Sequence, residues 1–220
     1  RLLTQLRRNL WADLTRVING ILHILRRLNF EHHCPTKGIQ TQAAEKWLQT
    51  LKLSAMDRLE MDHLLARRKL LEQQMNELDR RIRDSTVLHE GAVILRTTPG
   101  ATGYTALALA SRIGDIDRFP TPRSLPNYWG ITPSCRNSGE STKRLGSITK
   151  EGSTLARFLL GQLVLHVLRR DARMRAWYQR IKKRRGSKIA RVAVMRRLAV
   201  IFWHMLKKRQ AYLLCAVAGA

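Results

Sequence analysis

Apolar residues recur at three- and four-residue spacing along most of the chain. Between residues 3 and 28 they line one face of a single amphipathic helix of about seven turns. A shorter helix is predicted around residues 47–53. Period-two alternation, which is typical of half-buried strands, is rare and is clearest in the short segment 145–149. The pattern therefore predicts a mostly α fold.

The segment 56–88 carries a heptad repeat with one polar break, and residues 55–90 hold eight acids and seven bases. Such a/d spacing with flanks of mixed sign is typical of a coiled coil, or of a long antiparallel hairpin with the first helix. Because there are only three heptads, an ordinary bundle helix is an equal alternative. A coiled coil would make the protein a homo-oligomer through residues 55–90. The repeat positions are Met61, Leu64, Arg68, Leu71, Met75, Leu78 and Ile82.

After Gly91 the pattern changes to short helices separated by glycine and proline. Residues 99–103 form a turn between two helices that is either a helix-hairpin-helix or a simple αα turn. In the first case Gly100 and Gly103 would let the backbone approach a phosphate, although Thr102 replaces a glycine of the usual pattern. Residues 130–150 have a loop-like composition, and a last long helix is predicted over 187–214.

These changes divide the chain into three parts. Residues 1–90 are predicted to be a helical linker and coiled-coil segment, and residues 91–180 a compact helical domain with the hairpin-like turn. Residues 181–220 are predicted to be a basic C-terminal helix. The chain opens with Arg1 inside a helical pattern, which predicts a piece of a longer protein.

Charge identifies the class of partner. The 220 residues contain 41 Lys and Arg against 16 Asp and Glu, a net charge of +25. Residues 133–220 hold 21 of these bases and three acids, a net +18. Because 44% of the residues are hydrophobic, the chain is not a disordered basic tail. The charge disfavours an enzyme of small metabolites and favours a nucleic-acid partner.

The residues predicted to contact nucleic acid lie mostly in this basic part. Besides Gly100 and Gly103, they are Lys150, Lys182, Lys183, Arg184, Arg185, Lys188 and Arg191. Trp177, Tyr178 and Trp203 lie among the bases, where they either stack on nucleobases or serve as buried anchors, the commoner use of aromatics at helical spacing.

Metal and membrane sites are not predicted. The seven histidines never pair with cysteines or carboxylates at a metal-ligand spacing, and no carboxylate cluster suits a two-metal nuclease. The three separated cysteines form no disulfide framework, which favours a reducing cytosol. No apolar stretch approaches the length of a membrane span.

The segment 128–144 offers serine hydroxyls beside glycine in a basic setting. A serine that attacks a phosphodiester needs exposure, a flexible neighbour and cations that stabilise the developing charge. Ser138 is followed by Gly139 and accompanied by Arg136, Lys143 and Arg144, with Ser134 and Ser141 as weaker candidates. Composition alone, however, is typical of an ordinary loop.

A series of short motifs in fixed order resembles a known domain over about residues 90–180. It is similar to the C-terminal transposase domain of the DEDD transposase/recombinase family, which comprises the "one-ten" and "eleven-eleven" insertion sequences and relatives of the Piv DNA invertase. Thr102 and Ser153 stand where the family commonly has glycine and, nearby, asparagine. The motifs are Thr97–Gly100, Thr105–Ala106, Gly114–Ile116, Arg118–Phe119, Tyr128–Pro133, Ser138–Gly139, Ile148–Gly152 and Leu155–Arg157.

The resemblance implies a DNA transposase or site-specific recombinase whose serine nucleophile corresponds to Ser138. It also implies an N-terminal RuvC-like domain with four metal-binding acids, for which this chain has no counterpart, and therefore Mg²⁺ in that missing domain. DNA is the implied substrate, several members use an element-encoded guide RNA, and the expected location is the bacterial cytoplasm, at the nucleoid. The alternatives are a non-catalytic structural RNA- or DNA-binding protein, and a membrane-surface protein using 187–214 as a basic amphipathic helix.

Overall fold

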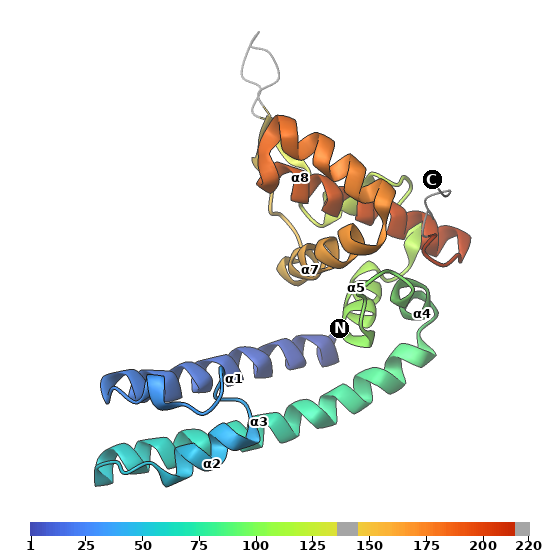
Figure 1. Ribbon diagram of the computed structural model, residues 1–220. Helices are drawn as coiled ribbons and strands as arrows, with labels where there is room; N and C mark the ends of the chain where they lie inside the picture. Colours follow the sequence, from blue (N-terminus) through green and yellow to red (C-terminus); the bar gives the residue numbers. More distant parts are fainter. Residues whose placement is uncertain (136–144, 214–220) are drawn as a thin grey trace. The chain divides into compact units, whose positions relative to one another are not determined.

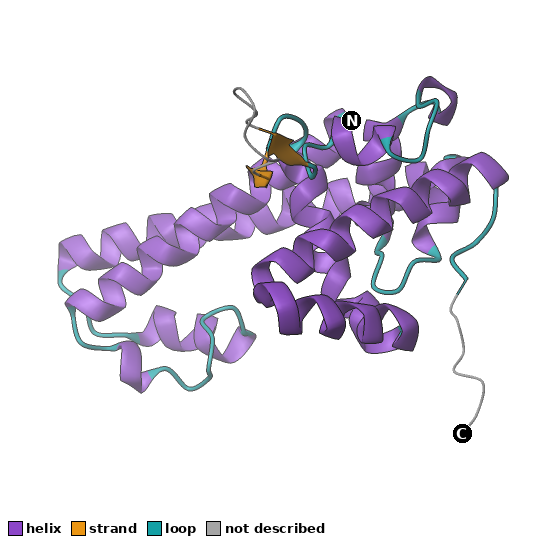
Figure 2. Ribbon diagram, turned by 90° about the horizontal axis from the view of Figure 1, so that it is seen from above, coloured by secondary structure: helices purple, strands orange, loops and turns teal. Residues whose placement is uncertain are grey.

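The computed structural model describes residues 1–135 and 145–213 (Figure 1). Within them the fold is mostly α, as predicted, with one pair of short strands (Figure 2). The chain forms two compact units, one of residues 2–81 and one of residues 82–220 together with Arg1. The elements are α1 (Leu2–Arg27), η1 (Glu31–His33), α2 (Gln42–Thr50), α3 (Ala55–Leu88), α4 (Glu90–Arg96), α5 (Gly103–Ile113), η2 (Ile116–Arg118), α6 (Ser124–Tyr128), β1 (Pro133–Cys135), β2 (Leu145–Ile148), α7 (Thr154–Arg170) and α8 (Ala172–Lys208).

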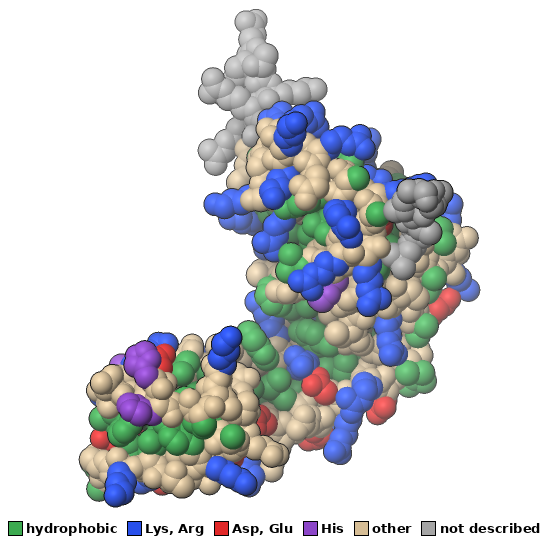
Figure 3. Space-filling model, viewed as in Figure 1, with side chains coloured by type: hydrophobic (Ala, Val, Ile, Leu, Met, Phe, Trp, Pro, Cys, Tyr) green, Lys and Arg blue, Asp and Glu red, His purple; other side chains and the backbone are tan. Residues whose placement is uncertain are grey.

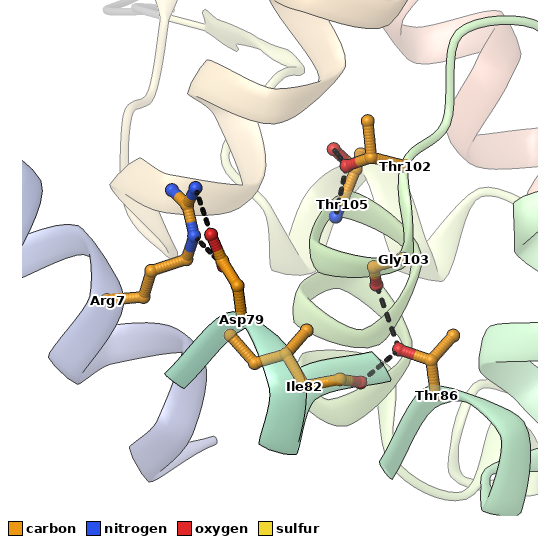
Figure 4. Close-up of polar contacts among 7 residues, drawn as sticks. All are labelled: Arg7, Asp79, Ile82, Thr86, Thr102, Gly103 and Thr105. Atoms are coloured by element: carbon orange, nitrogen blue, oxygen red, sulfur yellow. Dashed lines mark hydrogen bonds and ion pairs between the residues drawn. The ribbon is translucent and has the colours of Figure 1, made fainter. Parts of the chain in front are cut away.

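In the unit of residues 2–81, α1 and α3 run antiparallel. Arg7 near the start of α1 pairs with Asp79 late in α3 at 2.5 Å (Figure 4), whereas Arg27 at the end of α1 pairs with Asp57 early in α3 at 2.6 Å. The hairpin with the first helix is therefore the observed arrangement. Between the helices lies an apolar core that includes the heptad positions Met61 and Leu71. These two side chains are thus covered within the chain, without a second copy. Self-association through residues 55–90 stays a prediction.

Arg68, the polar break in the heptads, forms hydrogen bonds to the loop before α2. Its side chain is 5% exposed, and its guanidinium donates to the carbonyl oxygens of Ile39 at 2.8 Å and Gln40 at 3.2 Å. Its Nε donates to Glu72 at 2.7 Å. A buried carbonyl oxygen without a donor is costly, so a cation at this heptad position stabilises the loop.

The unit of residues 82–220 is built around α5. Residues 105–110 of this helix are all buried, and α5 packs against both α4 and α7. Its first turn is joined to the end of α3 by Thr86, whose hydroxyl lies 2.6 Å from the Ile82 carbonyl oxygen and 3.2 Å from that of Gly103 (Figure 4). Helix α7 packs in turn against α8.

Helix α8 folds back on itself at Gly186, whose φ of 81° and ψ of 166° are not helical. The Arg197 guanidinium lies 4.8 Å from the ring centre of Trp177. A straight helix would separate these residues by roughly 30 Å. Residues 172–185 and 187–208 are therefore two arms that lie side by side.

The predicted last helix, 187–214, begins where expected but ends earlier. Residue Arg209 adopts the left-handed conformation, with φ of 51°, and terminates the helix after Lys208. After the helix, the Tyr212 hydroxyl donates to the buried carboxylate of Asp171 at 2.9 Å. This bond holds the chain near the start of α8. The arm 172–185 is a further helix that the predicted elements did not include.

Arg68→Met should lower the free energy of unfolding by about 2 kcal/mol, because it leaves two carbonyl oxygens of the loop without their donor. The measurement is urea denaturation followed by circular dichroism. Arg81→Met on the same helix is the matched control, since Arg81 and Glu77 form an exposed pair with side chains 65% and 64% exposed. The control should cost less than about 0.5 kcal/mol. Equal losses in the two variants would contradict the role assigned to Arg68.

Candidate nucleic-acid interface

The two strands are continued by a stem in which residues 128–132 and 149–152 lie side by side. Pro133 pairs with Ile148 in the antiparallel ladder. Below this pair the Thr149 amide donates to the Thr132 carbonyl oxygen at 3.0 Å, and the Lys150 amide to that of Gly130 at 3.1 Å. Two motifs that were separate in the sequence thus form one structure, which holds both ends of the segment 136–144.

Two glycines permit the close approach of the stem backbones. Gly130 has a φ of +62°, and a Cβ there would lie 2.5 Å from the backbone nitrogen of Glu151. Gly152 has a φ of +139°, and its Cβ would lie 2.3 Å from the carbonyl oxygen of Tyr128. Because both conflicts are with backbone atoms, no rotation of a side chain would relieve them, and each position requires glycine.

Arg157 ties the stem to α7. Its Nη1 donates to the carbonyl oxygens of Trp129 at 3.2 Å and Gly152 at 3.0 Å, one from each side of the stem. Trp129 is fully buried, so the stem is anchored to the core as well. The last of the ordered motifs, Leu155–Arg157, therefore supports the two motifs that form the stem. Composition gave Arg157 no role, and its place in the motif was the one signal that pointed to it.

The predicted nucleic-acid contacts of α8 gather on both sides of the fold-back. Each of these side chains is exposed and has no ion pair with a described residue. Four lie on the first arm, whereas Lys188 and Arg191 on the second arm line a groove of about 360 Å³ together with Arg157. Figure 3 shows Lys and Arg side chains spread over this part of the molecule. The four are Lys182, Lys183, Arg184 and Arg185.

Comparison with known proteins places this unit in a family. Residues 92–179 match the family model described as "Transposase IS116/IS110/IS902 family". The chain contains a transposase domain of this family. The match begins in α4 and ends in the first arm of α8, so it includes the turn 99–103, the stem and Arg157.

Curated relatives agree with this assignment. The chain is 31% identical over 122 residues to "Transposase for insertion sequence element IS1111A" of Coxiella burnetii, which covers 54% of this chain and 33% of the relative. It is 32% identical over 123 residues to "Probable family 20 transposase" of Pseudomonas aeruginosa, covering 54% and 36%. "Transposase for insertion sequence element IS1328" of Yersinia enterocolitica is 27% identical over 135 residues, covering 60% and 40%. The chain thus spans about a third of the length of these relatives.

The candidate nucleophile of the transposase domain lies in the segment that the stem holds. Ser138, its supporting cations Arg136, Lys143 and Arg144, and the alternative Ser141 are outside the described residues. Ser134, the other alternative, is described. Its hydroxyl donates to the carbonyl oxygen of Ser147 at 3.0 Å across the hairpin, so it has an internal partner.

The two departures from the family pattern are both helix N-caps. The Thr102 hydroxyl accepts from the Thr105 amide at 3.2 Å and starts α5, and the Ser153 hydroxyl accepts from the Ala156 amide at 3.2 Å and starts α7. The backbone at Thr102 does not require glycine, because its φ is −81°. Threonine and serine are good residues for this role.

The glycines of the turn 99–103 have internal contacts. A Cβ at Gly100, whose φ is +81°, would lie 2.3 Å from the His166 side chain on α7. The Gly103 carbonyl oxygen accepts from Thr86. The turn thus packs against α7 and hydrogen-bonds to the end of α3. Phosphate binding by Gly100 and Gly103 stays a prediction. Lys150 is exposed at the stem, and its binding role also stays a prediction.

Residues 1–135 and 145–213 show no metal site and no membrane-spanning helix. In that part of the chain no group of three or more His, Cys, Asp or Glu side chains is arranged to hold a metal ion. No helix there is long and apolar enough to cross a membrane.

Gly152→Ala should lower the free energy of unfolding by about 1–3 kcal/mol, because it forces a Cβ against the Tyr128 carbonyl oxygen at an unfavourable φ. Gly161→Ala in α7 is the control, since its Cβ would meet nothing within 4 Å. That change should raise stability by about 0.5–1 kcal/mol through helix propensity. Both are measured by urea denaturation, and a Gly152→Ala variant as stable as the parent would contradict the close approach.

Proposed function

We propose that this chain is part of an insertion-sequence transposase that binds DNA and cuts and rejoins its strands. The observation that carries the proposal is that a domain matching a transposase family contains a hydrogen-bonded stem and adjoins a basic surface whose side chains form no ion pair with a described residue. The stem holds both ends of the segment bearing Ser138, and Arg157 belongs both to the stem and to the basic groove. DNA bound in the groove would therefore lie next to the reacting segment.

In the proposed reaction the Ser138 hydroxyl oxygen attacks a phosphorus atom of the DNA backbone. One P–O bond forms to serine and one breaks to a ribose oxygen, which takes up a proton as it leaves, while the serine proton passes to a base. Arg136, Lys143 and Arg144 would stabilise the charge on the crowded phosphate. Attack by the freed hydroxyl of another strand reverses the exchange and rejoins DNA, so no oxidant or energy source is needed.

The described residues offer no metal-binding cluster, so acids and Mg²⁺ for this reaction would come from a RuvC-like domain supplied by a longer chain or another protomer. When bound there, the metal would stabilise charge on the phosphate. A guide RNA is a further part of the proposal that comes from the resemblance, and self-association through residues 55–90 is one that comes from the heptad pattern. Without the acidic domain, a nucleic-acid-binding module is the alternative function of the chain.

Replacing Lys182, Lys183, Arg184 and Arg185 together by Gln should weaken binding to duplex DNA of any sequence and reduce the slope of log K against log salt. Each lost phosphate contact reduces that slope by about 0.9. The measurement is fluorescence anisotropy across a salt series.

The matched control replaces four exposed bases of α3, Arg67, Lys69, Arg80 and Arg83, none of which has an ion pair with a described residue. This variant has the same net charge as the first. If the two variants lose affinity equally, binding depends on net charge alone and the basic surface of α8 is not the interface.

Ser138→Ala should abolish covalent attachment to DNA while leaving DNA affinity nearly unchanged, because one neutral hydroxyl contributes little beside many phosphate contacts. The assay combines the chain with a RuvC-like domain and Mg²⁺, and resolves end-labelled DNA on a denaturing gel. Ser134→Ala and Ser141→Ala are the controls. An adduct that persists in Ser138→Ala and disappears in one of the controls moves the chemistry to that serine.

A further inference from the structure

A second basic cavity lies between α6, the stem and both arms of α8. Its volume is about 390 Å³, within the range of small-molecule sites. Two lining residues lie outside α8: Arg123 directly precedes α6, and Thr132 belongs to the stem. The first arm of α8 contributes Trp177, and the second arm contributes Arg196 and Arg197. The cavity exists because α8 folds back at Gly186 and brings its two arms together.

The described residues of the lining are cationic, polar or apolar, and none of them is a carboxylate. The side chains of Arg123 and Arg196 form no hydrogen bond or ion pair with a described residue, and both residues are exposed. The Asn127 side chain, which presents an amide donor and acceptor, also has no hydrogen-bond partner among the described residues. Such a set suits an anion attached to a polar, flat group, because guanidinium groups bind phosphate and amides pair with the edges of nucleobases.

Trp177 supplies the flat surface. Its indole is half-buried and lies 4.8 Å from the Arg197 guanidinium, so the cavity contains a stacked pair of planes. Nucleobases stack on both indoles and guanidiniums. Two other tryptophans of the unit have structural roles, since Trp129 is fully buried and the Trp203 indole donates to the Phe119 carbonyl oxygen at 2.9 Å.

We propose that this cavity binds one unpaired nucleotide, with its base stacked on the Trp177–Arg197 pair and its phosphate held by Arg123 and Arg196. The proposal rests on the proposed function, which it deepens. Thr132 lines the cavity and directly precedes β1, the strand that leads toward Ser138. An unpaired nucleotide held there lies beside the stem. A duplex keeps its bases paired and does not offer one for stacking.

The test measures binding of a labelled oligothymidylate and of a duplex at fixed salt by fluorescence anisotropy. Trp177→Leu keeps an apolar side chain but removes stacking, and should weaken single-strand binding about tenfold and duplex binding less than about twofold. Arg123→Gln, an exposed position that does not threaten folding, should also weaken single-strand binding. An abasic strand, which keeps the phosphates, should bind the parent and Trp177→Leu equally.

Further binding measurements separate the remaining explanations. Oligouridylate against oligothymidylate shows whether the cavity takes RNA or DNA, and dependence on Trp177 in either supports the proposal. If Trp177→Leu weakens the binding of neither oligonucleotide, the proposal is overturned. It is also overturned if an acidic peptide displaces the strand from the parent chain but not from Trp177→Leu. Arg191→Gln, in the groove beside Arg157, reports on the proposed function instead. If Arg191→Gln weakens duplex binding while Trp177→Leu changes nothing, the nucleotide site fails and the proposed function stands. If the parent chain binds neither strand nor duplex, both fail.

Discussion

The structure of the transposase domain depends on one close contact, the approach of two backbones at Gly130 and Gly152. No side chain separates the segments 128–132 and 149–152 there, so their amides and carbonyls pair directly. That contact connects the stem, which follows α6 and precedes α7, to both ends of the segment bearing Ser138. Arg157 bonds to carbonyl oxygens on both sides of the contact, and so transmits the position of α7 to the stem. A larger residue at either glycine would push the segments 128–132 and 149–152 apart. It would also move the carbonyl oxygens that accept from Arg157.

Charge is distributed differently in the two units. In residues 2–81, bases of the long helices meet acids, as in the pairs of Arg7 with Asp79 and Arg68 with Glu72. The basic residues around Gly186 have no such partners among the described residues. Like charges crowded at a turn repel one another and destabilise the folded state. The interaction that offsets this cost is external, and a polyanion supplies it most simply.

The sequence predicted the helices better than their neighbours. Periodicity shows which face of residues 55–88 is buried, but not what covers it, so a coiled coil, an intrachain hairpin and a bundle helix all fit the pattern. The ion pair of Arg7 with Asp79 identifies the hairpin. The fold-back of α8 escaped prediction because Gly186 and Ser187 are a short turn signal among good helix formers, with no proline beside them. The alternation at 145–149 coincides with β2 (Leu145–Ile148), whereas β1 has three residues, too few for alternation to be informative. The stem depends on a long-range contact that no local pattern reports, and only the order of motifs pointed to it. Ser138 and its cations lie outside the described residues and rest on the resemblance alone.

The second arm of α8 joins the two basic cavities. Val192 and Met195 face the groove beside Arg157, whereas Ala193 and Arg196 face the cavity of Trp177. Neighbouring residues of a helix point roughly 100° apart, so the arm presents two adjacent faces to two cavities, and each cavity borders a residue of the stem or of its buttress, Thr132 or Arg157. A nucleic acid that enters both must therefore pass around this arm. Its path is set by the rotation of the arm about its own axis, which the turn at Gly186 and the packing against α7 hold in place.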